Sequence, residues 1–346
     1  MKDISYKRFN LNIRKKGWSL NRPKVCQFEL TFKCDLRCNY CYVDCYNNPA
    51  YIKKELNTQQ VKNIIDKIYA AGVLWLYFSG GDPLTRPDFL ELYSYAKEKG
   101  FIIALFTNGY SISKGVAGYL SKKPPAKIEI TLNAADEALY EKISQVRGSF
   151  AKVMRGIDMM LKAKLPLKIK TQLTRDNLEE ANNIKRFVEK LGLGFWPSFG
   201  ISPRLNGDFS ACGLRVSPDE VLRIPGVKIL LKEEILRAKP SLCQCLLEKK
   251  DCVHLDPYGN TFSCTTVRKP SFSLLRVDIE TAQKKLLSLA RVWESAAFSK
   301  CKSCGLRKLC AFCPGMAYLE KGTMKEVIPY YCELAKATKR QMCGKT

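Results

Sequence analysis

Short apolar runs alternate with amphipathic segments along residues 24–200 of the chain. The runs are rich in Val, Ile, Leu and Phe, which is typical of buried strands, whereas the amphipathic segments repeat their apolar residues at helical spacing. The first amphipathic segment starts at a capping signal, Asn57-Thr58, and ends at Gly72. The predicted strands are residues 25–32, 74–78, 101–106, 127–132, 167–173 and 195–199.

Strand–helix units that repeat with short loops predict an α/β fold with a parallel sheet and right-handed crossovers. Six such units are too few for a full eight-stranded barrel, so they predict a partial (β/α)6 barrel of the TIM type. Phe195, Trp196 and Phe199 at the sixth strand are expected to pack in the core that closes this barrel, and stacking on a substrate is the alternative role.

The regular pattern ends after residue 200, where Pro203, Gly207 and Gly213 interrupt it. Ten of the sixteen cysteines lie beyond residue 240, which favours a small domain held together by metal. We therefore predict a basic N-terminal segment (1–23), the barrel (24–200), a linker (201–240) and a small cysteine-rich α+β domain (241–346).

Three polar or metal-binding motifs follow predicted strands, where barrels of this type carry their chemistry. They are Cys34-x3-Cys38-x2-Cys41, Gly80-Gly81-Asp82-Pro83 and Thr107-Asn108-Gly109. Three thiolates on one short loop can hold three irons of a 4Fe–4S cluster and leave the fourth iron open. An open metal position is where a substrate or cofactor binds.

The composition points to sulfur-based metal chemistry in the cytoplasm. The chain has sixteen cysteines and one histidine, His254, and its first residues lack the apolar stretch of a signal peptide. Disulfides are rare in the cytoplasm, so metal binding is the favoured use of these thiols. No apolar run reaches the roughly 18 residues of a membrane span, so we expect no membrane partner.

The chain is strongly basic, with a formal net charge of +25. Such a surface attracts anions such as nucleic acid, an acidic peptide or phosphates. Solubility explains the charge equally well, because charge alone does not identify a partner.

The cysteine motif, with Tyr40 before its last cysteine, resembles the signature of the radical S-adenosylmethionine (SAM) enzymes. The resemblance implies that Cys34, Cys38 and Cys41 hold a 4Fe–4S cluster whose open iron chelates the amino and carboxylate groups of SAM. Reductive cleavage then yields a 5′-deoxyadenosyl radical, which abstracts hydrogen from the substrate.

The glycine motif stands in the place of this family's Gly-Gly-Glu-Pro motif, which contacts the methionine amino group of SAM. This chain has Asp82 where Glu is usual. The family's motif binds largely through its backbone, so we expect the change to matter little. The SAM contacts that the resemblance and analogy imply are Tyr40, Gly80, Gly81, Asp82, Pro83, Asn108, Asn133 and Gln172.

A second set of cysteines resembles the SPASM extension of radical SAM enzymes, which carries two auxiliary iron–sulfur clusters. The set is Cys301-x2-Cys304-x5-Cys310-x2-Cys313 with Cys332, and Cys264 after Gly259. The resemblance implies a distal cluster on Cys301, Cys304, Cys310 and Cys332. It implies a proximal cluster on Cys264, Cys313 and two of Cys243, Cys245 and Cys252, with Cys243 and Cys245 favoured. A zinc ribbon on Cys301, Cys304, Cys310 and Cys313 is the alternative.

Cys212 lies outside both sets, on the segment between the barrel and the cysteine-rich region. Loops over a barrel rim often carry function. Cys212 is therefore the candidate catalytic residue, as a hydrogen-atom donor or a substrate ligand.

The two-module layout resembles radical SAM/SPASM enzymes that modify a ribosomally made peptide or protein by cross-linking, epimerisation or oxidation. The implied partners are an electron donor such as flavodoxin or ferredoxin, and a peptide whose leader is acidic or is bound by a separate protein. A sulfatase-type maturase is disfavoured, because Thr265 stands where such enzymes place an aspartate.

Two other classes stay open at this point. One is a radical SAM enzyme that acts on a small molecule in cofactor or haem biosynthesis. The other is a non-enzymatic iron–sulfur or zinc protein that binds nucleic acid, which leaves the open cluster and the glycine motif unexplained.

Overall fold

The six predicted strands form one curved parallel sheet. The computed structural model describes residues 6–20, 23–224, 252–296, 301 and 303–343. Its strands are β1 (Val25–Thr31), β2 (Trp75–Gly80), β3 (Ile102–Thr107), β4 (Lys127–Thr131), β5 (Leu167–Gln172) and β6 (Phe195–Ser198). Each differs from its predicted bounds by two residues at most, so the partial-barrel prediction is confirmed.

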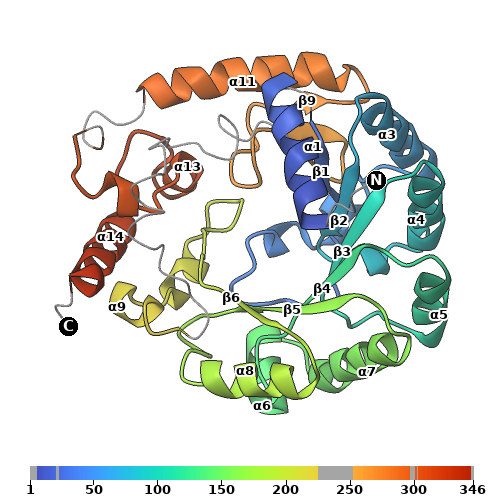
Figure 1. Cartoon of the computed structure of the whole chain (residues 1–346), viewed down its shortest axis with the longest axis horizontal. Coiled ribbons are helices and arrows are strands. Elements are labelled where there is room, and N and C mark those ends of the chain that lie inside the picture. The colour runs from blue at the N-terminus through green and yellow to red at the C-terminus, as the bar shows by residue number, and fades with distance from the viewer. Residues whose placement is uncertain (1–5, 21–22, 225–251, 297–300, 302, 344–346) are drawn as a thin grey trace.

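Helices cover the outer side of this sheet, as Figure 1 shows. They are α3 (Thr58–Ala70), α4 (Phe89–Glu98), α5 (Lys114–Lys122), α6 (Glu137–Ser144), α7 (Ser149–Lys162) and α8 (Ala181–Lys190). Helix α3 begins with the predicted cap, because Asn57 and Gln60 bond each other's backbone N–H. Its buried residues face the sheet: Val61, Ile64, Ile65 and Ile68.

The sheet has two chemically different faces, since successive side chains of a strand point to opposite sides. Paired residues form an apolar row across the outer face: Phe28, Phe78, Leu105, Ile128 and Leu167. All five are buried, and burying a side chain of this size stabilises a fold by roughly 1.5–3 kcal/mol. The main hydrophobic core therefore lies between the sheet and its helices.

One expectation about the core is wrong. Trp196 was expected to help close the barrel, but its side chain is 59% exposed. It lies on the last parallel strand, where no further strand or helix among the described residues covers its side of the sheet. Phe195 and Phe199 are partly buried against the two hydrophobic clusters.

The C-terminal part adds three strands to the opposite edge of the sheet, next to β1. These strands are β7 (Cys252–Leu255), β8 (Asn260–Phe262) and β9 (Phe272–Ser273). β7 runs parallel to β1, and β7, β8 and β9 are successively antiparallel. A tight turn at residues 256–260 joins β7 to β8, and the pairing of β7 with β1 was not predicted from the sequence. The predicted domain limits stay a prediction.

The other described helices are α1 (Tyr6–Leu20), α2 (Pro49–Ile52), α9 (Pro218–Val221), α11 (Ile279–Ala296), α13 (Pro314–Lys321) and α14 (Pro329–Met342). Of these, α9, α11, α13 and α14 lie along the side of the ring that the barrel helices leave open (Figure 1). A second hydrophobic cluster joins α9, α13 and α14 to the end of β5. Among the described residues, no helix is long and apolar enough to cross a membrane.

A buried ion pair fastens the C-terminal strands to the barrel. Arg268, which follows β8, donates two hydrogen bonds to the Glu29 carboxylate of β1, at 2.7 and 2.8 Å. The Glu29 side chain is 2% exposed and that of Arg268 is 14% exposed. Removing one partner of such a pair is costly, because the other charge stays buried without compensation.

We therefore predict that Arg268→Met lowers the free energy of unfolding by about 3 kcal/mol. Urea denaturation measures this change. The double variant Glu29→Gln/Arg268→Met should recover part of the loss, since it leaves no unpaired charge. Lys185→Met, which breaks an exposed pair with Glu189, is the control and should change little. Equal effects of Arg268→Met and the control would contradict the prediction.

Candidate functional site

The three cysteines of the N-terminal motif line one cavity at the carboxyl ends of the barrel strands. The cavity has a volume of about 400 Å³ and reaches from the cysteine loop down the inner face of the sheet. The predicted site residues that line it are Cys34, Cys38, Cys41, Tyr40, Gly80, Gly81, Asn108 and Asn133. The sequence thus located this cavity through motifs that follow different strands.

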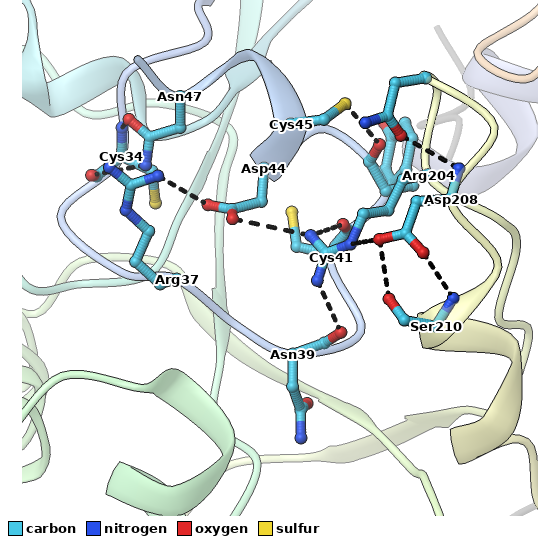
Figure 2. Close-up of polar contacts among 12 residues, drawn as sticks. Cys34, Arg37, Asn39, Cys41, Asp44, Cys45, Asn47, Arg204, Asp208 and Ser210 are labelled. Atoms are coloured by element: carbon cyan, nitrogen blue, oxygen red, sulfur yellow. Dashed lines mark hydrogen bonds and ion pairs between the residues drawn. The ribbon is translucent and has the colours of Figure 1, made fainter.

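Hydrogen bonds from outside the motif hold the cysteine loop in place (Figure 2). Asn47 accepts from the Cys34 N–H at 3.2 Å and donates to the Cys34 carbonyl at 3.1 Å. The Arg204 guanidinium donates to the carbonyls of Cys41 and Asn39, at 3.0 and 3.1 Å. Neither Asn47 nor Arg204 was predicted as a site residue, because only the folded chain brings them to the loop.

Arg204 is itself fixed by two acidic side chains. Asp208 lies 3.2 Å from its Nε, and Asp44 of the cysteine loop lies 3.6 Å from one terminal nitrogen. The neighbouring Leu205 N–H donates to the Tyr42 carbonyl at 2.9 Å. The segment after β6 is therefore attached to the cysteine loop by both side-chain and backbone contacts, of which Figure 2 shows those of the Arg204 side chain.

The glycine turn after β2 is pressed against the backbone of the cysteine loop. Gly81 N–H donates to the Thr31 carbonyl at 2.7 Å, and Asp82 N–H donates to the Lys33 carbonyl at 2.8 Å. A Cβ at Gly80 would lie 2.1 Å from the Thr31 oxygen, and one at Gly81 would lie 2.3 Å from the Lys33 oxygen. Gly80 also has φ of +134°, a region that only glycine occupies readily.

Asp82 does not line the cavity and instead accepts hydrogen bonds from neighbouring residues. Its side chain is fully buried, and one carboxylate oxygen accepts from the Thr107 hydroxyl at 2.7 Å and the Asn108 N–H at 2.8 Å. The other oxygen accepts from the Leu84 N–H at 2.9 Å. Burial raises the pKa of Asp82 to about 6, although these hydrogen bonds favour its charged form. Pro83 is also buried and begins the turn that follows.

Asn108 then reaches the cysteine loop, because its side-chain amide lies 3.4 Å from the Cys34 sulfur. Asn133 donates to the Tyr40 hydroxyl at 2.7 Å and accepts from the Gln172 N–H at 2.9 Å. The Gln172 side chain instead donates to the Ser198 carbonyl at 3.0 Å, and Gln172 is not among the described residues that line the cavity. Gln172 therefore positions the Asn133 side chain through its backbone N–H and does not itself line the cavity.

The donor set suits an iron–sulfur cluster. Burial raises the pKa of Cys38 to about 12 and that of Cys41 to about 11, so nearby positive charge such as iron is needed to stabilise thiolates here. Within the described residues, no three His, Cys, Asp or Glu side chains are arranged around a single metal ion. A cubane cluster needs a different arrangement, with one thiolate on each of three irons.

The C-terminal cysteines divide into those that the structure brings together and those that it does not describe. Cys243 and Cys245 lie outside the described residues. Burial is the largest cause that raises the pKa of Cys310, and the nearby thiols Cys332, Cys301 and Cys304 add to it. These four residues are the predicted distal set, and their ligation stays a prediction.

The described members of the predicted proximal set lie on three different segments. Cys264 follows β8, with its sulfur 3.0 Å from the Thr266 hydroxyl, and Cys313 precedes α13. Cys252 begins β7. Burial raises the pKa of the Cys26 thiol of β1, and a negative charge on the nearby Cys252 raises it further.

Cys212 does not line the cavity that holds the three motif cysteines. It lies on the 3-10 turn Ser210–Leu214 and is partly buried, and burial raises the pKa of its thiol. Its catalytic role stays a prediction.

The sequence analysis missed several residues of the cavity wall. Glu129, Thr131 and Lys170 line it from β4 and β5. Alternation of polar and apolar residues along these strands was the available signal, since a strand with one polar face exposes that face to water or to a ligand.

Comparisons with known proteins agree with this geometry. Residues 28–188 match the model of the Radical SAM superfamily. The "AdoMet-dependent heme synthase" of Methanosarcina barkeri is 26% identical over 343 residues, which cover 90% of this chain and 96% of that protein. The "Mycofactocin maturase MftC" of Mycolicibacterium smegmatis is 29% identical over 174 residues, and the "PqqA peptide cyclase" of Ruegeria pomeroyi is 32% identical over 168 residues. The alignments cover 50% and 47% of this chain, and 43% of each of these two relatives.

Solved structures share the fold along most of the chain. Streptococcus suis SuiB bound to the precursor peptide SuiA has a TM-score of 0.66 and 16% identity, over 94% of this chain and 81% of SuiB. The structure of anSMEcpe with AdoMet and a peptide has a TM-score of 0.65 and 16% identity, over 93% of this chain and 97% of that one. Residues 28–188, which contain both the cysteine loop and the glycine turn, are therefore identified as a radical SAM domain.

Proposed function

We propose that Cys34, Cys38 and Cys41 hold three irons of a 4Fe–4S cluster and that SAM binds at the fourth iron, inside the cavity. One observation carries this proposal: the three thiols and the Gly80–Gly81 turn line the same cavity. When bound, the cluster supplies the electron that cleaves SAM to methionine and a 5′-deoxyadenosyl radical, which takes a hydrogen atom from the substrate.

The chain's own residues prepare this site. Asp82 fixes the backbone of Asn108, and the Asn108 amide then reaches the Cys34 sulfur. Hydrogen bonds to cluster ligands are one of the means by which proteins set the reduction potential. Tyr40 and Asn133 line the cavity as a hydrogen-bonded pair and offer polar groups to SAM.

The auxiliary clusters are a separate part of the proposal. We assign the distal cluster to Cys301, Cys304, Cys310 and Cys332, whose thiols influence one another electrostatically. Cys264 and Cys313 belong to the proximal cluster, with two ligands among Cys243, Cys245 and Cys252. Clusters held by these cysteines would supply electron transfer between an external donor, such as flavodoxin or ferredoxin, and the substrate or the SAM site.

The first candidate substrate is a ribosomally made peptide or protein. Relatives named for peptide cyclisation and for maturation, which are about 30% identical over half of this chain, support it. A leader region would then be bound by the basic surface or by a separate protein. The second candidate is a tetrapyrrole, which the alignment with a relative named heme synthase favours because it covers 96% of that protein.

The central test replaces one ligand of the open cluster. Reconstituted wild-type protein should contain about twelve irons per chain, and Cys34→Ala about eight, if all three clusters are cubanes. The wild type given SAM and a reductant should release 5′-deoxyadenosine, whereas Cys34→Ala should not. Cys343→Ala, at an exposed cysteine outside the motifs, is the control. An active Cys34→Ala variant would show that the cluster lies elsewhere.

Asp82→Ala is expected to slow SAM cleavage by about tenfold or more without changing the iron content. The variant leaves the Thr107 hydroxyl and the Asn108 N–H without their buried partner, so Asn108 loses its position beside Cys34. The release of 5′-deoxyadenosine and the iron content of the same sample are the two measurements. Unchanged SAM cleavage would mean that Asn108 keeps its position without Asp82.

Arg204→Lys is expected to speed the loss of iron to a chelator by about threefold or more, because lysine cannot bond two loop carbonyls in a fork. The absorbance of the cluster reports the rate. Arg37→Lys is the matched control in the same loop, since Arg37 lies 3.6 Å from Asp44 but is 51% exposed. Equal rates for the two variants would remove Arg204 from the support of the cysteine loop.

A further inference from the structure

The inner face of the barrel sheet is polar and aromatic. In a closed barrel, branched apolar side chains fill the interior. Here, residues paired across neighbouring strands form a row of different character: Phe106, Glu129 and Lys168, with Thr131, Lys170 and Trp196 in the row nearer the rim. Side chains of this kind do not make a self-filling core, so among the described residues the inner face keeps polar and aromatic groups available to a bound molecule.

Two lysines on this face form no ion pair with the described residues. Lys127 lies 2.7 Å from Glu129, the one acidic residue in the paired rows, and forms an ion pair with it. Lys168 and Lys170 are exposed, and neither has an ion-pair partner among the residues that the structure describes. The inner face of β5 therefore presents two ammonium groups outside any described ion pair.

These lysines lie on a continuous path from the cysteine loop. Lys170 and Glu129 line the 400 Å³ cavity of the three motif cysteines, and they also line an adjoining cavity of about 220 Å³. Lys168 and Trp196 belong to the wall of the adjoining cavity. The Lys168 ammonium lies 5.6 Å from the centre of the Trp196 ring, which is a cation–π contact.

This wall suits a molecule with separate anionic groups. Lys168 and Lys170 are two positions apart on one strand, so their Cα atoms are about 6.5 Å apart and can engage two separate groups. No arginine is among the described residues that line either cavity, so these two lysines are the cationic groups of the wall, and an ammonium pairs with a carboxylate as a point charge. Trp196 adds an apolar surface on which a planar or aromatic part of the bound molecule can stack.

We propose that Lys168 and Lys170 bind the carboxylates of the substrate, with Trp196 as the apolar platform, so that the substrate carries at least two acidic groups. This inference rests on the proposed function, because it takes the cavity of the three cysteines as the place of hydrogen abstraction. It applies to both candidate substrates, since an acidic peptide and a tetrapyrrole with acidic side chains offer the same group.

The test compares acids with their neutral amides on the reconstituted full chain. The peptide probes are a fluorescently labelled tetraglutamate and the matching tetraglutamine, read by anisotropy. The tetrapyrrole probes are a metal-free ring with four propionates and the same ring with four propionamides, read by their own fluorescence. The variant is Lys168→Gln/Lys170→Gln. Its control, Lys114→Gln/Lys122→Gln, removes two exposed lysines from the outer helix α5 and changes the net charge equally.

The wild type and the control should bind at least one acid about tenfold or more tightly than its amide, and the Lys168→Gln/Lys170→Gln variant should lose this preference. The acid that is preferred identifies the substrate as a peptide or a tetrapyrrole. The inference is overturned if the wild type prefers neither acid, if the variant keeps the preference, or if the variant loses SAM binding, which would assign the lysines to the SAM carboxylate.

Release of 5′-deoxyadenosine without added substrate separates this inference from the proposed function. A wild type that releases none contradicts the proposed function, whatever the probes do. Release together with equal binding of acids and amides contradicts the carboxylate inference alone.

Discussion

The contact between the glycine turn and the cysteine loop is the constraint on which the site depends. Two backbone hydrogen bonds join the turn to the carbonyls of Thr31 and Lys33, and a side chain at Gly80 or Gly81 would collide with those carbonyls. The contact brings the ends of β1 and β2 together at the rim. Asp82 extends it to the end of β3, because its carboxylate holds Thr107 and the Asn108 backbone. Hydrogen bonds thus join the ends of three strands to one another.

Below this rim, the inner face of the partial barrel carries polar and aromatic side chains. The outer face of the sheet is apolar and is covered by helices, so it supplies the stability of the fold. The inner face does not need to pack on itself, because the sheet does not close into a full barrel. It is therefore free to carry charged and aromatic side chains, and Lys170 and Trp196 occupy paired positions there.

Among the described residues, those after β6 contribute to the site by holding its loops and do not line the cavity of the three cysteines. Arg204 holds two carbonyls of the cysteine loop, and the Arg268–Glu29 pair fastens the segment after β8 to β1 (Figure 2 shows the first of these). Both contacts use an arginine that donates to acceptors far away in the sequence. They connect the stability of the C-terminal part with the geometry of the cysteine loop.

The sequence by itself determined the six parallel strands, their helices and the position of the three cysteines at the rim. These follow from local periodicity and from parallel topology, which puts every strand's carboxyl end at one edge. It also identified the cysteine motif and the glycine motif, because the spacing of their residues can be read along the chain. Only the tertiary structure decided that β7 pairs with β1, that Asp82 faces Asn108 and not the cavity, and that Trp196 is exposed. Each of these depends on contacts between residues that are distant in the chain, and local pattern carries no information about such partners.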